Sequence, residues 1–276
     1  MLLNIEGQEL VLPTLPHVAR KIQHMIDDIN FSADHILAAI SGDPAIAAQV
    51  IKAANGSHFA DKPRVDNVKA AVARLGYKPL RKLLTGVIEI SSRSHASHPV
   101  VVKHLHDFWE HSRDVATYSF MLAKNLKVLS PDQAMLAGLL HDIGTLPLCL
   151  HAEFAVPHLS HETLDRFVRN FRSTISEKLL HAWNFPIEII DAVTGHEKPH
   201  RPGDEGPASC ADIIAVANLL DRASAKSAAW ENIAAVEKLR LSPAVCRDFH
   251  EQFRDEIRAT RELLFPQVPT AATRPA

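Results

Sequence analysis

The stretch LAGLLHDIGTLPL, residues Leu136–Leu148, places an ionisable pair, His141-Asp142, within a segment that is otherwise almost entirely apolar. An imidazole and a carboxylate that are removed from water cost free energy unless a hydrogen-bond partner or a metal ion satisfies them. The stretch therefore predicts one of two things: a metal or ligand site, or a hydrogen-bonded tie that holds neighbouring helices in register.

Apolar residues recur at helical spacing along nearly the whole chain, and no window of strand length alternates convincingly with period two. One amphipathic stripe consists of Val18, Ile22, Met25 and Ile29. Asp43-Pro44 is typical of an N-cap followed by proline in the first helical turn. A long helix is expected over residues 100–127, and Ser130–Gln133 predicts a capping box at the start of the next helix. Further helices are expected at residues 161–171 and 175–185. The fold class predicted is all-α.

A short polar stretch at residues 91–99, SSRSHASHP, is typical of a turn and divides the predicted helices into two groups. We expect an N-terminal helical subdomain over residues 1–92 and a second helical subdomain over residues 100–265. Residues 266–276 are expected to form a frayed tail.

Composition narrows the classes of function. The chain has 276 residues, 46% hydrophobic and 22% charged, and a formal net charge of −2, which is ordinary globular usage. A chain without excess positive charge lacks the main driving force for non-specific nucleic-acid binding, so no nucleic-acid partner is expected. Three widely spaced cysteines, no signal peptide and no long uninterrupted apolar run predict a cytoplasmic protein that does not span a membrane.

His111 interrupts the apolar stripe of the long helix and is expected to point inward, toward His141 and Asp142. Imidazole nitrogen and carboxylate oxygen from different helices are suitable ligands for a divalent cation. The alternative is that each residue is simply buried and hydrogen-bonded to a neighbour. The other histidines near the turn are expected to lie at the surface; they are His95, His98, His104 and His106.

Five stretches in a fixed order resemble the HDOD family, the HD-related output domain of bacterial signalling proteins. They are LPTLPHVARKI (12–22), ISGDPAIAAQVIKAANGSHF (40–59), NVKAAVARLGYKPLRKLL (67–84), LAGLLHDIGTLPL (136–148) and AWNFPIEIIDAVTGHEKP (182–199). The resemblance covers about residues 12–200. It implies an all-α protein in which an N-terminal helical subdomain packs on an HD-type helical subdomain.

The catalytic HD phosphohydrolases, which are similar to the second half, imply metal ligands at His111, His141 and Asp142. Other positions depart from their pattern. Arg172 stands where metal-bridging relatives carry a histidine, and Gly195-His196-Glu197 keeps only one imidazole of a histidine pair. Asn218 stands where a distal aspartate is expected, with Asp212 and Asp221 nearby as substitutes.

An amide in place of a carboxylate removes negative charge, and a guanidinium in place of an imidazole adds positive charge that cannot bind metal. These departures predict a degenerate metal site, formed by His111, His141 and Asp142 with weak support from His196 and Asp221. No cofactor is expected, apart from one divalent metal ion if the remnant site is occupied.

The sequence leaves three hypotheses about function. The first is a non-catalytic regulatory protein that binds an unknown signalling protein or a small ligand. The second is a metal-dependent phosphohydrolase acting on a nucleotide or another phosphodiester. The third is a structural scaffold in which the HD pair only ties helices together.

Overall fold

The computed structural model describes residues 12, 14–27, 33–93, 96–155, 159–197, 206–221 and 229–266. Within these ranges the chain forms helices and no strand, so the all-α prediction is confirmed. The tail predicted at 266–276 lies outside the described residues except for its first position, and so does His95.

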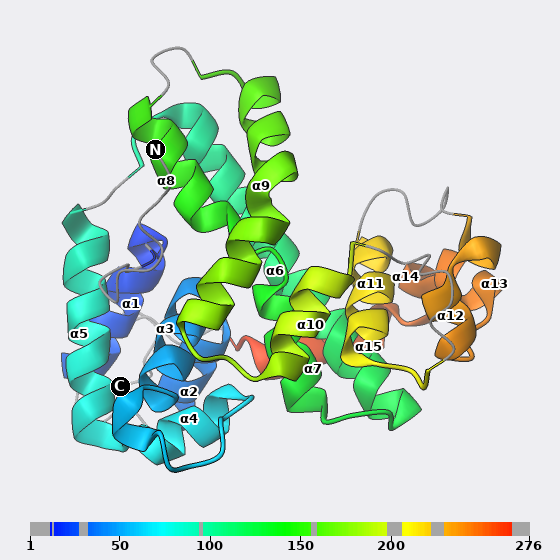
Figure 1. Ribbon diagram of the computed structural model, residues 1–276, viewed down its shortest axis with the longest axis horizontal. Helices are drawn as coiled ribbons and strands as arrows, with labels where there is room; N and C mark the ends of the chain where they lie inside the picture. Colours follow the sequence, from blue (N-terminus) through cyan, green and yellow to red (C-terminus); the bar gives the residue numbers. More distant parts are fainter. Residues whose placement is uncertain are drawn as a thin grey trace, which may run out of the picture.

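The first helices pack on one another at one side of the molecule, coloured blue to cyan in Figure 1. They are α1 (Pro16–Asp27), α2 (Ala33–Ser41), α3 (Pro44–Ala54), the short 3-10 helix η1 (Ser57–Phe59), α4 (Val68–Leu75) and α5 (Tyr77–Arg93). The cap predicted at Asp43 is confirmed, because its carboxylate accepts a hydrogen bond of 2.8 Å from the backbone N–H of Ile46.

The middle of the molecule holds the long helix α6 and the helices packed around it (Figure 1). These are α6 (Pro99–Leu126), α7 (Pro131–Leu140), α8 (Thr145–Ala155), α9 (His161–Ala182), α10 (Ile187–Gly195) and α11 (Cys210–Asp221). The long helix was predicted within one residue at each end. The two helices predicted at 161–171 and 175–185 are wrong as separate elements, because the chain runs through both as the single helix α9.

Shorter helices complete the chain. They are η3 (Trp230–Asn232), α12 (Ala234–Lys238), α13 (Pro243–Arg247), α14 (Phe249–Gln252) and α15 (Arg254–Leu264). The last of these lies against α6, where the guanidinium of Arg261 pairs with Asp114 and, at 2.6 Å, with Glu110. These ion pairs therefore hold α15 against the middle of α6.

A buried polar contact joins the first helices to α6. Asp43 is fully buried, and its Oδ2 accepts hydrogen bonds from the Thr14 hydroxyl and, at 2.7 Å, from the indole N–H of Trp109. The same carboxylate also caps α3, so one side chain fixes three separate segments. Trp109 lies in the core, with 1% of its surface exposed.

Two glycines allow the HD segment to approach its neighbours closely. A Cβ atom at Gly138 would lie 2.7 Å from Ser119 Oγ and 3.0 Å from the backbone of Ala116, both on α6. A Cβ atom at Gly144 would lie 2.4 Å from the carbonyl oxygen of Arg172 on α9. Because neither position has room for a side chain, the α7–α8 turn lies directly against both long helices.

The capping box predicted at Ser130–Gln133 is wrong in detail: Ser130 is the N-cap residue, but its side chain makes no capping hydrogen bond.

The segment Pro131–Ala155 is long and apolar enough to cross a membrane by composition, which was not predicted from the sequence. Of its apolar window, 89% is buried inside the fold, as is usual for the central helices of a helical protein.

Candidate metal centre and adjoining pocket

The residues predicted to form the site come together from four segments. His111 lies in the middle of α6, and His141-Asp142 forms the start of the turn between α7 and α8. His196 directly follows α10, and Asp221 ends α11. His141, Asp142 and His196 are all buried, with exposed fractions between 1% and 4%.

Each of the three imidazoles donates a hydrogen bond from Nδ1. His111 Nδ1 pairs with the carboxylate of Asp221. His141 Nδ1 lies 2.8 Å from the carbonyl oxygen of Gly138, and His196 Nδ1 lies 2.6 Å from that of Val193. Since a carbonyl oxygen can only accept, His141 and His196 both carry a proton on Nδ1, and the neutral form of each ring has its lone pair on Nε2.

The Nε2 atoms of His141 and His196 each face a nitrogen or oxygen atom of another residue. Nε2 of His111 and Nε2 of His141 are 3.0 Å apart, and Nε2 of His196 is 3.6 Å from Oδ1 of Asp142. Neither Oδ1 of Asp142 nor Nε2 of His196 has a hydrogen-bond partner among the described residues. Asp142 Oδ1 and the lone pair of a neutral His196 repel each other unless a proton or a cation lies between them, so this pair favours a positive charge at that point.

The donor set fits one divalent cation. The ligand atoms of His111, His141 and Asp142 all lie within 4.8 Å of one another. Burial is the main cause that lowers the pKa of His141 well below its ordinary value, so the imidazole is neutral and able to bind metal near neutral pH. A hydrogen bond from the other ring nitrogen to a carbonyl or carboxylate is the arrangement found behind metal-binding histidines.

A second group of ligand atoms, from Asp142, His196 and Glu197, also lies within 4.8 Å, but a protein cation already contacts it. Nη1 of Arg172 donates to Asp142 Oδ2 over 2.7 Å, and Nε of Arg172 donates to Glu197 Oε1 over 2.8 Å. Burial opposes ionisation of Asp142, but the Arg172 guanidinium that donates to this carboxylate favours its charged form, and the pKa of the carboxyl lies below its ordinary value. Asp142 is therefore an anion shared between the first ligand group and Arg172.

The two aspartates expected as substitutes near Asn218, Asp212 and Asp221, lie in different places. Asp221 lies behind His111, where it orients the ring instead of facing the ligand atoms. Asp212 accepts hydrogen bonds of 2.8 Å and 2.7 Å from the backbone N–H and hydroxyl of Ser209, so it caps α11 and takes no part in the site. Asn218 is buried, and its Oδ1 has no hydrogen-bond partner among the described residues.

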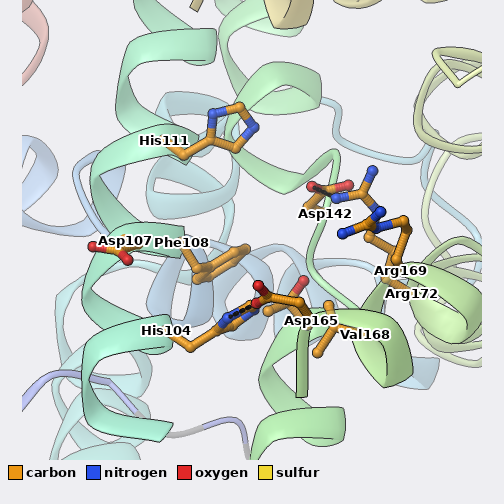
Figure 2. Close-up of a pocket in the computed structure, with 10 residues that line it drawn as sticks. His104, Asp107, Phe108, His111, Asp142, Asp165, Val168, Arg169 and Arg172 are labelled. Carbon is orange, nitrogen blue, oxygen red and sulfur yellow. Dashed lines mark hydrogen bonds and ion pairs between the residues drawn. The ribbon is translucent and has the colours of Figure 1, made fainter. Parts of the chain in front are cut away.

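A pocket of about 470 Å³ opens from the His111 and Asp142 side of the site, between α6 and α9. Figure 2 shows nine of its residues labelled, with Arg169 and Arg172 directed toward Asp142. Its lining comprises His104, Asp107, Phe108, His111, Asp142, Thr145, Asp165, Val168, Arg169 and Arg172.

Several residues that line this pocket were not predicted from the sequence. His104 was expected to lie at the surface, but it lines the pocket, and its Nδ1 pairs with Asp165 at 3.1 Å. His98 was expected there too, but it is the N-cap residue of α6, and only His106 is exposed as predicted. Glu197 and Arg169 were not singled out as part of the site; the spacing of three residues between Arg169 and Arg172, one helical turn, was the signal available.

Comparison with known proteins shows which folds the chain resembles. Among solved structures, the chain resembles the MmoQ response regulator of Methylococcus capsulatus str. Bath, with a TM-score of 0.62 and 21% identity, covering 84% of this chain and 93% of that one. It also resembles a "putative metal-dependent phosphohydrolase" of Shewanella amazonensis SB2B, with a TM-score of 0.52 and 25% identity, covering 94% and 95% of the two chains.

A protein of Treponema pallidum (strain Nichols) is 27% identical over 229 residues, which are 76% of this chain and 42% of that protein. The chain thus spans less than half the length of this relative. The family model of the HDOD domain matches residues 12–199. This stretch is more than half of the chain and includes both the first helices and the HD segment. The chain is therefore a member of the HDOD domain family.

Proposed function

We propose that this protein is a non-catalytic regulatory module of bacterial signalling, which binds a partner protein or a small ligand without hydrolysing it. The observation that carries the proposal is the position of Arg172, whose guanidinium bridges Asp142 and Glu197. Two-metal hydrolysis needs a cation on each side of a shared carboxylate. On one side of Asp142 the chain supplies a fixed guanidinium, which stays protonated, donates hydrogen bonds and cannot coordinate a substrate oxygen or a water molecule as a metal ion does.

The remaining ligand atoms suit a single cation, which His111, His141 and Asp142 would hold. A bound divalent ion would supply Lewis acidity and lower the pKa of a bound water molecule. The chain's own residues orient and position the ligands: Asp221 and the Gly138 carbonyl fix the rings of His111 and His141, and Arg172 fixes the carboxylate of Asp142. Such a site can recognise an anion, but it lacks the second cation that would stabilise the leaving oxygen.

The pocket between α6 and α9 supports ligand recognition. It places Arg169 and Arg172 at one wall and the His104–Asp165 pair at another. Arginines one turn apart on a helix present two planar donors to a carboxylate or a phosphate. The HDOD family match supports a signalling role, and the organisms of the relatives support a bacterial one.

A second candidate function is that of a single-metal phosphohydrolase. It is favoured by one observation, the Nε2 atoms of His111 and His141, which lie 3.0 Å apart beside an open pocket. His111 and His141 would hold a cation that would supply Lewis acidity, and Arg169 and Arg172 in the same pocket would bind phosphate oxygens.

Turnover assays separate the two functions. The purified full chain is incubated with bis(p-nitrophenyl) phosphate, mononucleotides and cyclic dinucleotides, with Mn²⁺, Mg²⁺, Fe²⁺ or Ni²⁺ supplied in turn. We expect no turnover above that of the His141→Ala variant. Robust hydrolysis that His141→Ala abolishes would refute the regulatory proposal and establish the hydrolase.

A further inference from the structure

A second pocket lies on a different side of the fold, where the end of α3 and the helix η1 meet the turn between α9 and α10. Its volume is about 540 Å³, which is in the usual range for small-molecule sites. The walls come from three parts of the chain: residues 49–64, Leu83 on α5, and residues 182–184. It shares no lining residue with the pocket beside His111 and Asp142. We refer to it as the seam pocket.

The seam pocket is lined by three cations, Lys52, Lys62 and Arg64, and by no carboxylate. By contrast, the pocket beside the HD pair has three aspartates in its wall. Lys62 and Arg64 are exposed, and neither forms an ion pair with a described residue. Positive charges that line a concave wall without a counter-ion raise the local concentration of anions.

Two of the cations are held in place by the protein. Nη1 of Arg64 donates a hydrogen bond of 2.9 Å to the carbonyl oxygen of Phe185, which leaves Nε and Nη2 without a described partner. Nζ of Lys52 lies 4.5 Å from the centre of the Trp183 ring. Burial lowers the pKa of Lys52, so an anion that contacted its ammonium group would also relieve the cost of burying that charge.

The remaining wall combines polar and apolar groups. Trp183 is 2% exposed, and Phe59 is half-buried between the ring of His58 and the cations of Lys62 and Arg74. Gln49 and Asn184 contribute amides. A site with several cations on one wall and polar and apolar groups beside them matches a small ligand that carries negative charge.

We propose that the seam pocket binds a small phosphate-bearing ligand of about nucleotide size. Lys52 and Lys62 act as point charges, and Arg64 offers its two remaining nitrogens as a planar donor pair for phosphate oxygens. Because the pocket wall includes the α9–α10 turn, the ligand joins the first helices to the helices that carry Arg172 and His196. The proposal does not depend on the function assigned to the HD pocket.

The test measures binding of ATP, GTP and inorganic phosphate to the full chain by calorimetry, in the presence of EDTA so that no divalent cation takes part. The test variant is Lys62→Glu combined with Arg64→Glu. The matched control is Arg20→Glu combined with Lys124→Glu, which makes the same charge change at two exposed residues outside the pocket. Thermal unfolding checks that each variant folds, and the single variant Lys62→Glu serves if the Arg64 change unfolds the chain.

We expect at least one phosphate-bearing probe to bind, with a dissociation constant that rises about tenfold or more in the pocket variant and stays unchanged in the control. The His141→Ala variant should bind as tightly as the wild type. Tighter binding of a nucleotide than of phosphate would identify an organic phosphate, and equal binding would identify the free anion. The proposal is overturned if no probe binds at about 1 mM, or if the pocket and control variants lose affinity equally.

Discussion

His111 and His141 face each other with their Nε2 atoms 3.0 Å apart, and each ring is turned that way by a hydrogen bond at its Nδ1. For His111 the partner is the carboxylate of Asp221, and for His141 it is the carbonyl oxygen of Gly138. When His111 carries its proton on Nδ1 alone, both facing nitrogens have a lone pair and can bind a cation, even though the second ligand group contacts Arg172.

The variant Asp221→Asn should weaken cation binding. An amide in this position orients the His111 ring less strongly and removes negative charge behind it, so affinity for Mn²⁺ or Ni²⁺ should fall about 10-fold to 100-fold. Calorimetric titration measures the change. Asp212→Asn, the same substitution on the same helix but at its cap, should leave metal affinity intact; equal effects of the two variants would argue against an orienting role for Asp221.

The variant Gly144→Ala should destabilise the fold. Its Cβ atom would meet the carbonyl oxygen of Arg172 at 2.4 Å and the backbone nitrogen of Ser176 at 2.7 Å, so α9 would have to move. We expect a loss of about 1–3 kcal/mol or more in the free energy of unfolding, measured in urea.

The matched control is Gly86→Ala on α5, where an added Cβ has no described atom within 4 Å. Replacing glycine by alanine inside a helix should stabilise the chain by up to about 1 kcal/mol. If Gly144→Ala were as well tolerated as Gly86→Ala, the close approach of the HD turn to α9 would be wrong.

Asp43→Ala should lower the free energy of unfolding by more than the loss of an ordinary helix cap does. Besides uncapping α3, the change leaves the indole N–H of Trp109 buried without its acceptor. We expect a loss of about 2–4 kcal/mol, the sum of a cap and an unsatisfied buried donor. Asn67→Ala removes the cap of α4 alone and should cost about 1 kcal/mol. Similar unfolding free energies for the two variants would show that the Trp109 contact contributes little.

The buried thiols should be unreactive in the folded chain. Burial raises the pKa of Cys149 to about 12 and that of Cys246 to about 11, whereas an unfolded cysteine ionises near pH 8.5. In a Cys210→Ser background, labelling by a disulfide reagent should stay slow between about pH 7 and pH 9 and accelerate only on unfolding. Rapid labelling of the native chain that follows a pKa near 8.5 would contradict the buried positions.

The sequence predicted the helices best where local signals were strong. Proline at the first turn and an aspartate cap located the start of α3, and the apolar stripe located α6 within a residue at each end. The break expected within α9 does not exist, because Ser173 and Thr174 are tolerated in a helix that packs against α8 and α10. Tertiary packing overrides weak local propensity there.

The sequence also identified the HD pair, His111 and the departure at Arg172, because these residues carry recognisable types at family-like spacing. It did not show which acidic residue of α11 reaches His111, since Asp212 and Asp221 differ only in their place along the helix. The Arg172–Glu197 contact and the seam pocket join segments that are distant in sequence or belong to different helices. Such contacts depend on how the helices pack, which one sequence read alone does not specify.

The proposed function requires that Arg172 takes the place of a second metal ion beside Asp142. It is tested most directly by counting metal ions per chain with mass spectrometry, after removing all metal and dialysing the protein against Mn²⁺ or Ni²⁺. We predict no more than one ion per wild-type chain, and a second ion in Arg172→His, where an imidazole replaces the guanidinium beside His196 and Glu197. Two ions bound by the wild-type chain would contradict the account.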